Sequence, residues 1–317
     1  MRSPIYLAGH SGLIGSAFLR RFKKEGASLP LTKIHSELDL SDGNKVRQFF
    51  EREKPQTVIL AAGKTGGIAA NQKFPADYIS QNLAIQSNVF QAAKEVDADK
   101  VLFLGSSCMY PRDCTQPMRE DQLLTGKPEP TSISYAMAKL AGLHCCLAYN
   151  QQYMKQSFVP VIPASVYGPG DNFDDQTSHV LASLIRKFHE AKVKGIGKVV
   201  LWGTGQPRRE FIHVDDLVDA CFHLMAEDGV DCNLPVNVGT GQDYSIIELA
   251  GMVSRIVGYE GDVEWDKSKP DGAPKKLLDS ARLYECGWKP EIDIERGIRS
   301  TYDWYISHED AAKTDHH

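Results

Sequence analysis

Tyr135 and Lys139 have side chains and a spacing suited to acid–base chemistry. They stand four residues apart, and positions i and i+4 share one face of a helix, so the phenol and the ammonium can enter one pocket. A phenol titrates at about pH 10 in its reference state. A nearby cation favours the phenolate, which predicts a tyrosine with a pKa lowered toward neutral pH. The same spacing also arises by chance, as a half-buried tyrosine above a solvated lysine, so the surrounding motifs must decide between these interpretations.

Ser106 and Cys108 precede this helix and carry two further polar side chains. In an extended segment, residues two apart point to the same side, so the hydroxyl and the thiol can enter the same cleft. A thiol, with a reference pKa of about 8.5, can exchange protons as a thiolate. The alternative for Cys108 is an inert small residue of the core.

A glycine-rich turn follows the first predicted strand. The apolar run at 4–8 leads into Gly9-His10-Ser11-Gly12-Leu13-Ile14-Gly15, and a helical pattern follows. In this context a turn binds pyrophosphate, because the backbone comes close to the anion and the helix N-terminus attracts it. The spacing G-x-x-G-x-x-G therefore predicts dinucleotide binding, with a plain tight turn as the alternative.

The rest of the first half alternates between apolar strands and helices. Strands are predicted at 57–62, 101–104 and 158–162, and helices at 45–54, 76–94 and 134–153. This order predicts an α/β fold, a Rossmann-type doubly wound parallel sheet that binds ligands at the carboxyl ends of its strands.

Two regions of the chain differ in pattern, which predicts two domains. We expect a dinucleotide-binding domain at 1–165, with return segments near 207–226. Beyond it, the pattern loosens into loop-rich segments. We expect a smaller C-terminal α/β lobe, mainly at 166–317, that binds the substrate.

The end of the second predicted strand, within 29–34, is where such a fold reads the adenosine ribose. An acidic residue there binds a free 2′-hydroxyl, and a basic residue binds a 2′-phosphate. Lys33, His35 and Ser36 occupy this place, and the first acid is Glu37. The pattern favours NADP(H) as the cofactor.

Composition and charge exclude several classes of function. The formal charge is −5 over 317 residues, whereas a nucleic-acid binder usually has a basic surface. No nucleic-acid partner is therefore expected. The apolar run near the N-terminus is too short for a signal peptide, and no stretch is long and apolar enough for a membrane helix. We therefore expect a cytoplasmic protein. The seven cysteines show no C-x-x-C spacing, so we expect neither disulfides nor a metal site.

Longer motifs give the chain a family resemblance over roughly residues 4–305. It resembles the extended short-chain dehydrogenases/reductases and, among them, the GDP-L-fucose synthases. The segments that carry the resemblance are 8–16, 74–77, 102–111, 135–142, 171–173, 178–180, 186–190, 209–216 and 269–272. The glycine turn and Y-x-x-x-K indicate only the superfamily, whereas Ser-Ser-Cys at 106–108 and Ser-His-Val at 178–180 are more specific.

The resemblance implies epimerisation of GDP-4-keto-6-deoxy-D-mannose at C3 and C5, followed by reduction of its C4 ketone with NADPH. Cys108 and His179 match the residues that exchange protons in the epimerisation. Tyr135 would protonate the C4 oxygen, and Ser106 would polarise the ketone with it. Lys139 would lower the pKa of Tyr135 and bind the nicotinamide ribose.

The resemblance also implies binding residues and an assembly. For the GDP-sugar, these are Lys187, Trp202, Arg209 and Asp271. For the cofactor, they are Gly9, His10, Ser11, Gly12, Leu13, Ile14, Gly15, His35, Asp39, Leu40, Leu104, Gly105, Ser106, Lys139, Pro163, Ala164, Ser165, Val166 and His179. A homodimer through the helices at about 76–95 and 134–152 is implied as well.

Departures from the family pattern lie in the cleft. Ser11 and His35 stand where members have arginines associated with the 2′-phosphate, and Ser165 stands where they have an asparagine near the nicotinamide. A related GDP-sugar, or only one of the two activities, therefore stays open. A non-catalytic NAD(P)-binding protein is the third alternative, against which the retained serine, tyrosine and lysine argue.

Overall fold

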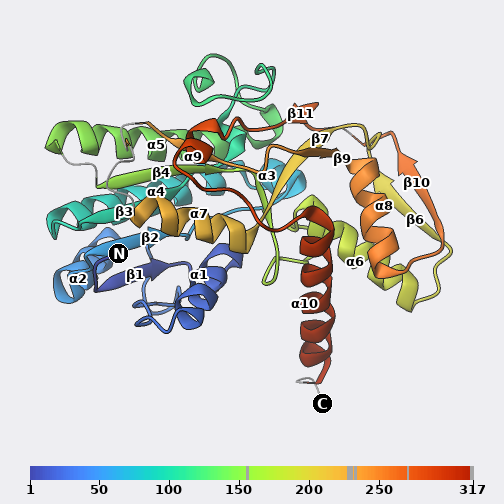
Figure 1. The fold of residues 1–317 in the computed structure, drawn as a ribbon, viewed down its shortest axis with the longest axis horizontal. Helices are drawn as coiled ribbons and strands as arrows, with labels where there is room; N and C mark the ends of the chain where they lie inside the picture. Colours follow the sequence, from blue (N-terminus) through green and yellow to red (C-terminus); the bar gives the residue numbers. More distant parts are fainter. Residues whose placement is uncertain (155–156, 227–230, 232–233, 270, 315–317) are drawn as a thin grey trace.

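A parallel β-sheet forms the centre of the protein, seen in a computed structural model that describes residues 1–154, 157–226, 231, 234–269 and 271–314 (Figure 1). Cys232 and Pro270 lie outside these residues. The five strands of the sheet are, in spatial order, β1 (Ile5–Ala8), β2 (Thr57–Leu60), β3 (Lys100–Leu104), β4 (Phe158–Pro163) and β8 (Val236–Val238). All neighbours are parallel. The predicted Rossmann-type sheet is confirmed.

Helices cover both faces of this sheet (Figure 1). One layer contains α2 (Gly43–Glu53), α4 (Pro75–Glu95) and α5 (Ile133–Tyr153), with α4 packed against both of the others. In the other layer, α1 (Leu13–Lys24) packs against α7 (Val214–Ala226). With both faces covered, β1 to β4 are largely apolar, which is why these four strands could be predicted.

The prediction of a strand within 29–34 is wrong. Within that segment, Leu31 alone pairs with β1, as an isolated bridge to Tyr6. Its backbone bonds Ile5 O at 2.8 Å and Leu7 N at 3.0 Å. Pro30 precedes it and has no N–H, which removes a ladder donor and is unfavourable within a sheet.

Smaller sheets and a second hydrophobic cluster make up the other part of the molecule. One sheet joins β11 (Lys275–Lys276), β7 (Arg208–His213) and β5 (Ser165–Tyr167), with β9 (Asp243–Ser245) also on β7. A second sheet joins β10 (Asp262–Asp266) and β6 (Lys198–Trp202). The helices of this part are α6 (Val180–Val193), α8 (Ile246–Val257) and α10 (Ile294–Thr314). In Figure 1, β7 and β11 lie between the central sheet and these elements.

Short helices complete the described chain. They are α3 (Ile68–Lys73), α9 (Ala281–Glu285), η1 (Ser107–Met109), η2 (Glu120–Gln122) and η3 (Pro130–Ser132). Across the described ranges, no helix is long and apolar enough to cross a membrane. The same residues contain no group of three or more His, Cys, Asp or Glu side chains that could hold a metal ion.

Candidate active site

The turn between β1 and α1 has a shape that requires glycine. Gly9 has a φ of +81°, and a Cβ there would lie 2.6 Å from the Ala62 nitrogen. A Cβ on Gly15 would lie 2.0 Å from the Gly9 carbonyl oxygen. Gly12 caps α1 without a side chain, which leaves the first backbone N–H groups open to an anion. This cradle fits the predicted pyrophosphate. Its other residues are His10, Ser11, Leu13 and Ile14.

The residues expected to read the adenosine ribose follow Leu31. Lys33 Nζ lies 3.1 Å from the Glu37 carboxylate, so its charge is already paired. His35 is exposed, and its Nδ1 lies 3.9 Å from the Asp39 carboxylate. Leu40 is buried and belongs to the main hydrophobic cluster. The region therefore holds charges of both signs instead of a cluster of free cations.

A helical cap, and not strand alternation, brings Ser106 and Cys108 together. Ser106 caps η1, and its hydroxyl accepts a hydrogen bond from Cys108 N at 3.2 Å. The expectation of an extended segment is therefore wrong after Ser106, because the chain turns at once. The preceding Gly105 donates to Val161 O at 2.7 Å, which ties this turn to the end of the sheet.

Tyr135 and Lys139 lie on α5 next to this turn, close together as their spacing predicts, but the pKa of the tyrosine differs from the prediction. Burial raises the pKa of Tyr135 well above its ordinary value, and the Cys108 thiol adds to this, while a hydrogen bond with Ser106 opposes it. Lys139 Nζ donates to Leu104 O at 2.8 Å and lies 5.9 Å from the centroid of the Tyr135 ring. Burial lowers the pKa of Lys139 to about 8. The prediction that Lys139 lowers the pKa of Tyr135 is wrong in this structure, since a carbonyl holds the ammonium and the phenol stays protonated.

Lys276 is a member of the site that the sequence did not reveal. It lies on β11, and its Nζ is 3.5 Å from Cys108 Sγ. Burial opposes ionisation of the thiol, but the Lys276 charge and the hydroxyls of Ser106 and Ser132 outweigh it, so the pKa of Cys108 lies below its ordinary value. A two-residue strand has no periodicity to detect. The available signal was its place just after the motif at 269–272.

Arg209 extends the site from β7. Burial lowers the pKa of its guanidinium, and the nearby Cys108, Glu129 and Asp271 oppose this. A Cβ on Gly272 would lie 3.0 Å from Arg209 Nη2, so the loop that carries Asp271 touches the guanidinium. Glu129 is only 5% exposed and was also missed, because a glutamate between two prolines shows no pattern.

Trp202 is the centre of an outer group of predicted substrate residues. Its ring is 59% exposed. The ammonium groups of Lys187 and Lys269 lie 6.0 and 5.3 Å from its centroid. Asp271 is held by Thr204, two residues after Trp202. The N–H and hydroxyl of Thr204 donate to the carboxylate at 2.9 and 2.6 Å. Asp271 is also close enough to Arg209 to affect its pKa, so it lies between the outer group and the inner site.

His179 stands at the start of α6. It caps this helix, and although it is exposed, the surrounding protein desolvates the imidazole and lowers its pKa. The preceding Thr177 accepts a hydrogen bond from Gly67 N at 3.2 Å, which ties this segment to the loop after β2. In the part of the chain that the structure describes, no hydrogen bond joins His179 to Cys108.

The last predicted cofactor residues follow β4. Pro163 ends this strand, and Ala164 N donates to Val238 O at 2.9 Å. Ser165 and Val166 then start β5 and pair with β7. These residues, the glycine turn and Ser106 all follow parallel strands, so they lie at the carboxyl edge of the sheet, where ligands bind in this fold.

Comparisons with known proteins give the site its context. Residues 5–239 match the NAD dependent epimerase/dehydratase family. GDP-L-fucose synthase 1 of Arabidopsis thaliana is 49% identical over 305 residues, which are 96% of this chain and 93% of the relative. The GDP-L-fucose synthase of Escherichia coli is 46% identical over 316 residues, 98% of each chain.

A solved structure extends the likeness to the fold. The GDP-mannoheptose C4 reductase from Campylobacter jejuni, with NADP bound, superposes with a TM-score of 0.87 at 36% identity and covers 96% of this chain and 99% of its own. The similarity thus extends far beyond the glycine turn and includes both hydrophobic clusters. The chain belongs to the NAD dependent epimerase/dehydratase family and, within it, to the group of the GDP-L-fucose synthases.

Proposed function

We propose that the protein is a bifunctional epimerase and reductase that converts GDP-4-keto-6-deoxy-D-mannose to GDP-L-fucose. The observation that carries this proposal is the presence of two chemistries at one place. The thiol of Cys108 has a lowered pKa, and its backbone N–H donates a hydrogen bond to Ser106 Oγ. The same serine also contacts the phenol of Tyr135. A plain C4 reductase needs the hydroxyl and the phenol but not the thiol. The names of the relatives at 49% and 46% identity support the same conclusion.

Epimerisation begins with removal of a proton from the carbon next to the C4 ketone. The Cys108 thiolate takes this proton and forms an S–H bond, and the electron pair of the C–H bond moves to the C4 oxygen as an enolate. The O–H groups of Ser106 and Tyr135 stabilise this oxygen. His179 returns a proton to the opposite face of the carbon, which inverts its configuration. Because desolvation lowers the pKa of this imidazole, the step uses its protonated form, which is the minor form at neutral pH. A thiol and an imidazole titrate near enough to neutral pH to recover their starting forms.

Tyr135 supplies the proton for reduction. Its raised pKa keeps the phenol protonated until the C4 oxygen gains negative charge, as a general acid requires. Lys139, with a pKa lowered to about 8, remains largely cationic at neutral pH and stabilises the phenolate that forms. The role of Lys139 is thus to stabilise the product state of the acid and not to ionise it beforehand.

The cofactor is NADP(H), which supplies the reducing equivalent for C4 when bound. The NADP-bound reductase at 36% identity supports this assignment. The glycine cradle of β1 and α1 would hold the pyrophosphate, and Lys139 would bind the nicotinamide ribose. Ser11 and His35 would meet the 2′-phosphate in place of arginines.

The GDP end of the substrate fits the outer group. Trp202 offers an exposed indole face for a guanine ring. Lys187 and Arg209 supply cations for the diphosphate. Asp271, held by the N–H and hydroxyl of Thr204, offers a carboxylate for hydrogen bonds to guanine or to the sugar.

We further propose a homodimer that forms through α4 and α5. Leu83 on α4 and Met137 on α5 are 39% and 44% exposed. Between Asp77 and Lys94, α4 has no Asp, Glu, Lys or Arg. In α5, Lys139 is the single residue of these four types, and it is buried. Apolar exposed faces of this kind favour association.

We also propose a cytoplasmic location and a division into two domains. The described cysteines are free thiols, which suits a reducing compartment. Two separate clusters of buried apolar side chains support two domains. We propose a dinucleotide-binding domain at 1–165, with return segments near 207–226, and a substrate lobe mainly at 166–317. The first cluster also includes Val236, Val238, Leu278, Leu283 and Trp288 from beyond these return segments.

Deuterium exchange tests the proposed function. The protein is incubated with GDP-4-keto-6-deoxy-D-mannose in D₂O, with and without NADPH, and C3 and C5 are followed by NMR. We expect exchange at both carbons without cofactor, and GDP-L-fucose once NADPH is added. Cys108→Ser should abolish exchange. His179→Gln should block inversion and therefore the formation of GDP-L-fucose, because Cys108 alone can still exchange its proton with solvent. Reduction without exchange would leave a C4 reductase alone, and exchange that survives Cys108→Ser, or GDP-L-fucose formed by His179→Gln, would contradict the assigned residues.

A further inference from the structure

The contact between Lys276 and Cys108 joins two distant parts of the chain. Lys276 Nζ lies 3.5 Å from Cys108 Sγ, across a separation of 168 residues. Neither residue is exposed. A cation held this close to a shielded sulfur stabilises its ionised form more strongly than it would in water.

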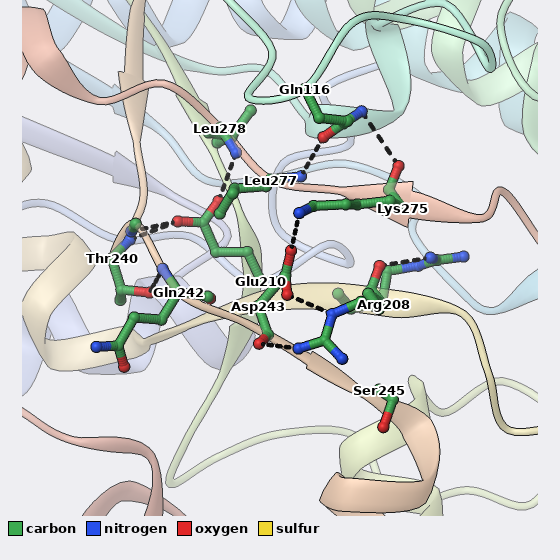
Figure 2. A network of polar contacts seen from close by, with 12 residues as sticks. Gln116, Arg208, Glu210, Thr240, Gln242, Asp243, Ser245, Lys275, Leu277 and Leu278 are labelled. Carbon is green, nitrogen blue, oxygen red and sulfur yellow. Dashed lines mark hydrogen bonds and ion pairs between the residues drawn. The ribbon is translucent and has the colours of Figure 1, made fainter.

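Hydrogen bonds on both sides hold the backbone of β11 in place (Figure 2). Gln116 donates to Lys275 O at 3.3 Å and accepts from Leu277 N at 2.8 Å. The Glu210 carboxylate accepts from Leu278 N at 2.8 Å. Leu277 O also accepts from Met118 N at 2.7 Å. Lys276 thus lies between anchored neighbours, so its side chain starts from a fixed point.

Strand geometry separates the two adjacent lysines. Successive side chains of a strand point to opposite faces. Lys275 accordingly forms an ion pair with Asp243 at 2.8 Å, as Figure 2 shows, while Lys276 contacts Cys108. The chain therefore contains a matched pair of cations on one strand, of which one faces the thiol and one does not.

Other groups also face the sulfur. Arg209 on β7 pairs in register with Lys276, and the charge of Cys108 raises the pKa of its guanidinium. The phenol of Tyr135 approaches from α5, and the hydroxyls of Ser106 and Ser132 complete the surroundings. Of the two cations, Lys276 is in direct contact with the sulfur, whereas Arg209 also faces Glu129 and Asp271.

We propose that Lys276 is a positioning residue that keeps the Cys108 sulfur ionised for proton abstraction. The proposal rests on the proposed function and names the group that activates its base. Before turnover, the ammonium stabilises the thiolate, and the thiol proton has left to solvent. When the sulfur accepts the carbon-bound proton, the ammonium keeps its own protons and stays in place for the next cycle. The anchored β11 prevents the cation from leaving when the sulfur becomes neutral.

The pH dependence of Cys108 alkylation tests this without any substrate. The holoenzyme, with NADP bound, is treated with iodoacetamide between about pH 5.5 and 10, a range that spans the reference value of a thiol. Mass spectrometry of the peptide with Cys108 gives the rate, and Cys108→Ser is the blank. In Lys276→Met we expect the midpoint to rise by about 1–2 units. That lowers the thiolate fraction at neutral pH roughly 10- to 100-fold, partly offset by the higher nucleophilicity of a more basic thiolate.

Two further variants distinguish the loss of the Lys276 charge from a disturbance of strand β11. Lys276→Arg keeps the cation and should keep the midpoint within about 0.5 unit, far less than the loss of a charge partner causes. Lys275→Met removes a cation that faces Asp243 and should also leave the midpoint unchanged. An unchanged midpoint in Lys276→Met, or equal shifts in all three variants, would overturn the proposal.

One further measurement keeps the test decisive if Lys276→Met fails to fold. In the unaltered protein, the alkylation midpoint of Cys108 must lie below that of an ordinary thiol, about 8.5. A midpoint at or above this value would refute the activation of Cys108. Because alkylation needs no GDP-sugar, failure here is distinguishable from failure of the deuterium-exchange experiment.

Discussion

Replacement of Glu210 by alanine is expected to cost about 3–5 kcal/mol of stability, because one carboxylate satisfies three backbone donors. Oε1 accepts from Thr240 N at 2.7 Å and Gly241 N at 2.8 Å, and Oε2 accepts from Leu278 N at 2.8 Å (Figure 2). Glu210 is 2% exposed. A buried N–H without an acceptor costs about 1–3 kcal/mol. Three such losses would sum to about 3–9 kcal/mol. The expected total lies in the lower part of this range, because Thr240 and Gly241 are not buried and water can reach their N–H groups.

Thermal unfolding measures this loss. At roughly 2 °C per kcal/mol for a chain of this size, Glu210→Ala should lower Tm by about 6–10 °C. Lys198→Ala is the control, because it removes an exposed ion pair with Glu264 and should cost less than about 1 kcal/mol. A loss in Glu210→Ala no larger than in this control would refute the reasoning and show that other groups satisfy the three donors.

The same carboxyl gives stability a pH dependence. Burial raises the pKa of Glu210 to about 7, above the value of about 4.3 in an unfolded chain. Its contribution is fully present below about pH 4.3 and is lost as pH rises toward 7, because the unfolded chain gives up its proton first. Glu210→Gln is neutral throughout, so the stability difference between wild type and variant should fall across this window. Parallel profiles would mean that the pKa is not raised.

Three further substitutions test the site. Gly15→Ala places a Cβ 2.0 Å from the Gly9 carbonyl oxygen. We expect NADPH affinity, measured by fluorescence titration, to fall at least about 100-fold, which corresponds to roughly 2.7 kcal/mol. Near-native binding would contradict the assignment of this glycine turn to the cofactor pyrophosphate. Tyr135→Phe should slow NADPH oxidation by roughly 10²–10⁴, as loss of a general acid does, while deuterium exchange stays measurable. Trp202→Ala should raise KM for the GDP-sugar roughly 5- to 150-fold, from a lost stacking contact of about 1–3 kcal/mol, with kcat nearly constant; a change in kcat alone would exclude base stacking.

The central sheet could be predicted because a buried parallel strand is a simple pattern. β2 and β4 are buried along their whole length. β4 is accordingly an unbroken apolar run, and β2 is apolar after Thr57. The error at 29–34 has a local cause, since Pro30 precedes the one bridged residue. β8 could not be predicted, because its three residues join β4 from far along the chain.

The site was predictable where its members are close in sequence and not where they come from far apart. Tyr135 and Lys139 share a helix, so their proximity follows from helical geometry. The predicted lowering of the pKa of Tyr135 was wrong. Burial, which spacing does not reveal, raises this pKa, and the Leu104 carbonyl holds the ammonium of Lys139. Lys276 was missed because a contact across 168 residues leaves no local mark.

The late position of β11 sets the time at which reactivity appears during synthesis. A ribosome completes the segment with Ser106, Cys108 and Tyr135 long before it adds Lys276. Until that lysine docks, the sulfur of the nascent chain is an ordinary thiol, slow to react with cellular oxidants and electrophiles. The Cys108 sulfur thus gains its cationic partner only when translation has passed β11 and this segment has folded against β7.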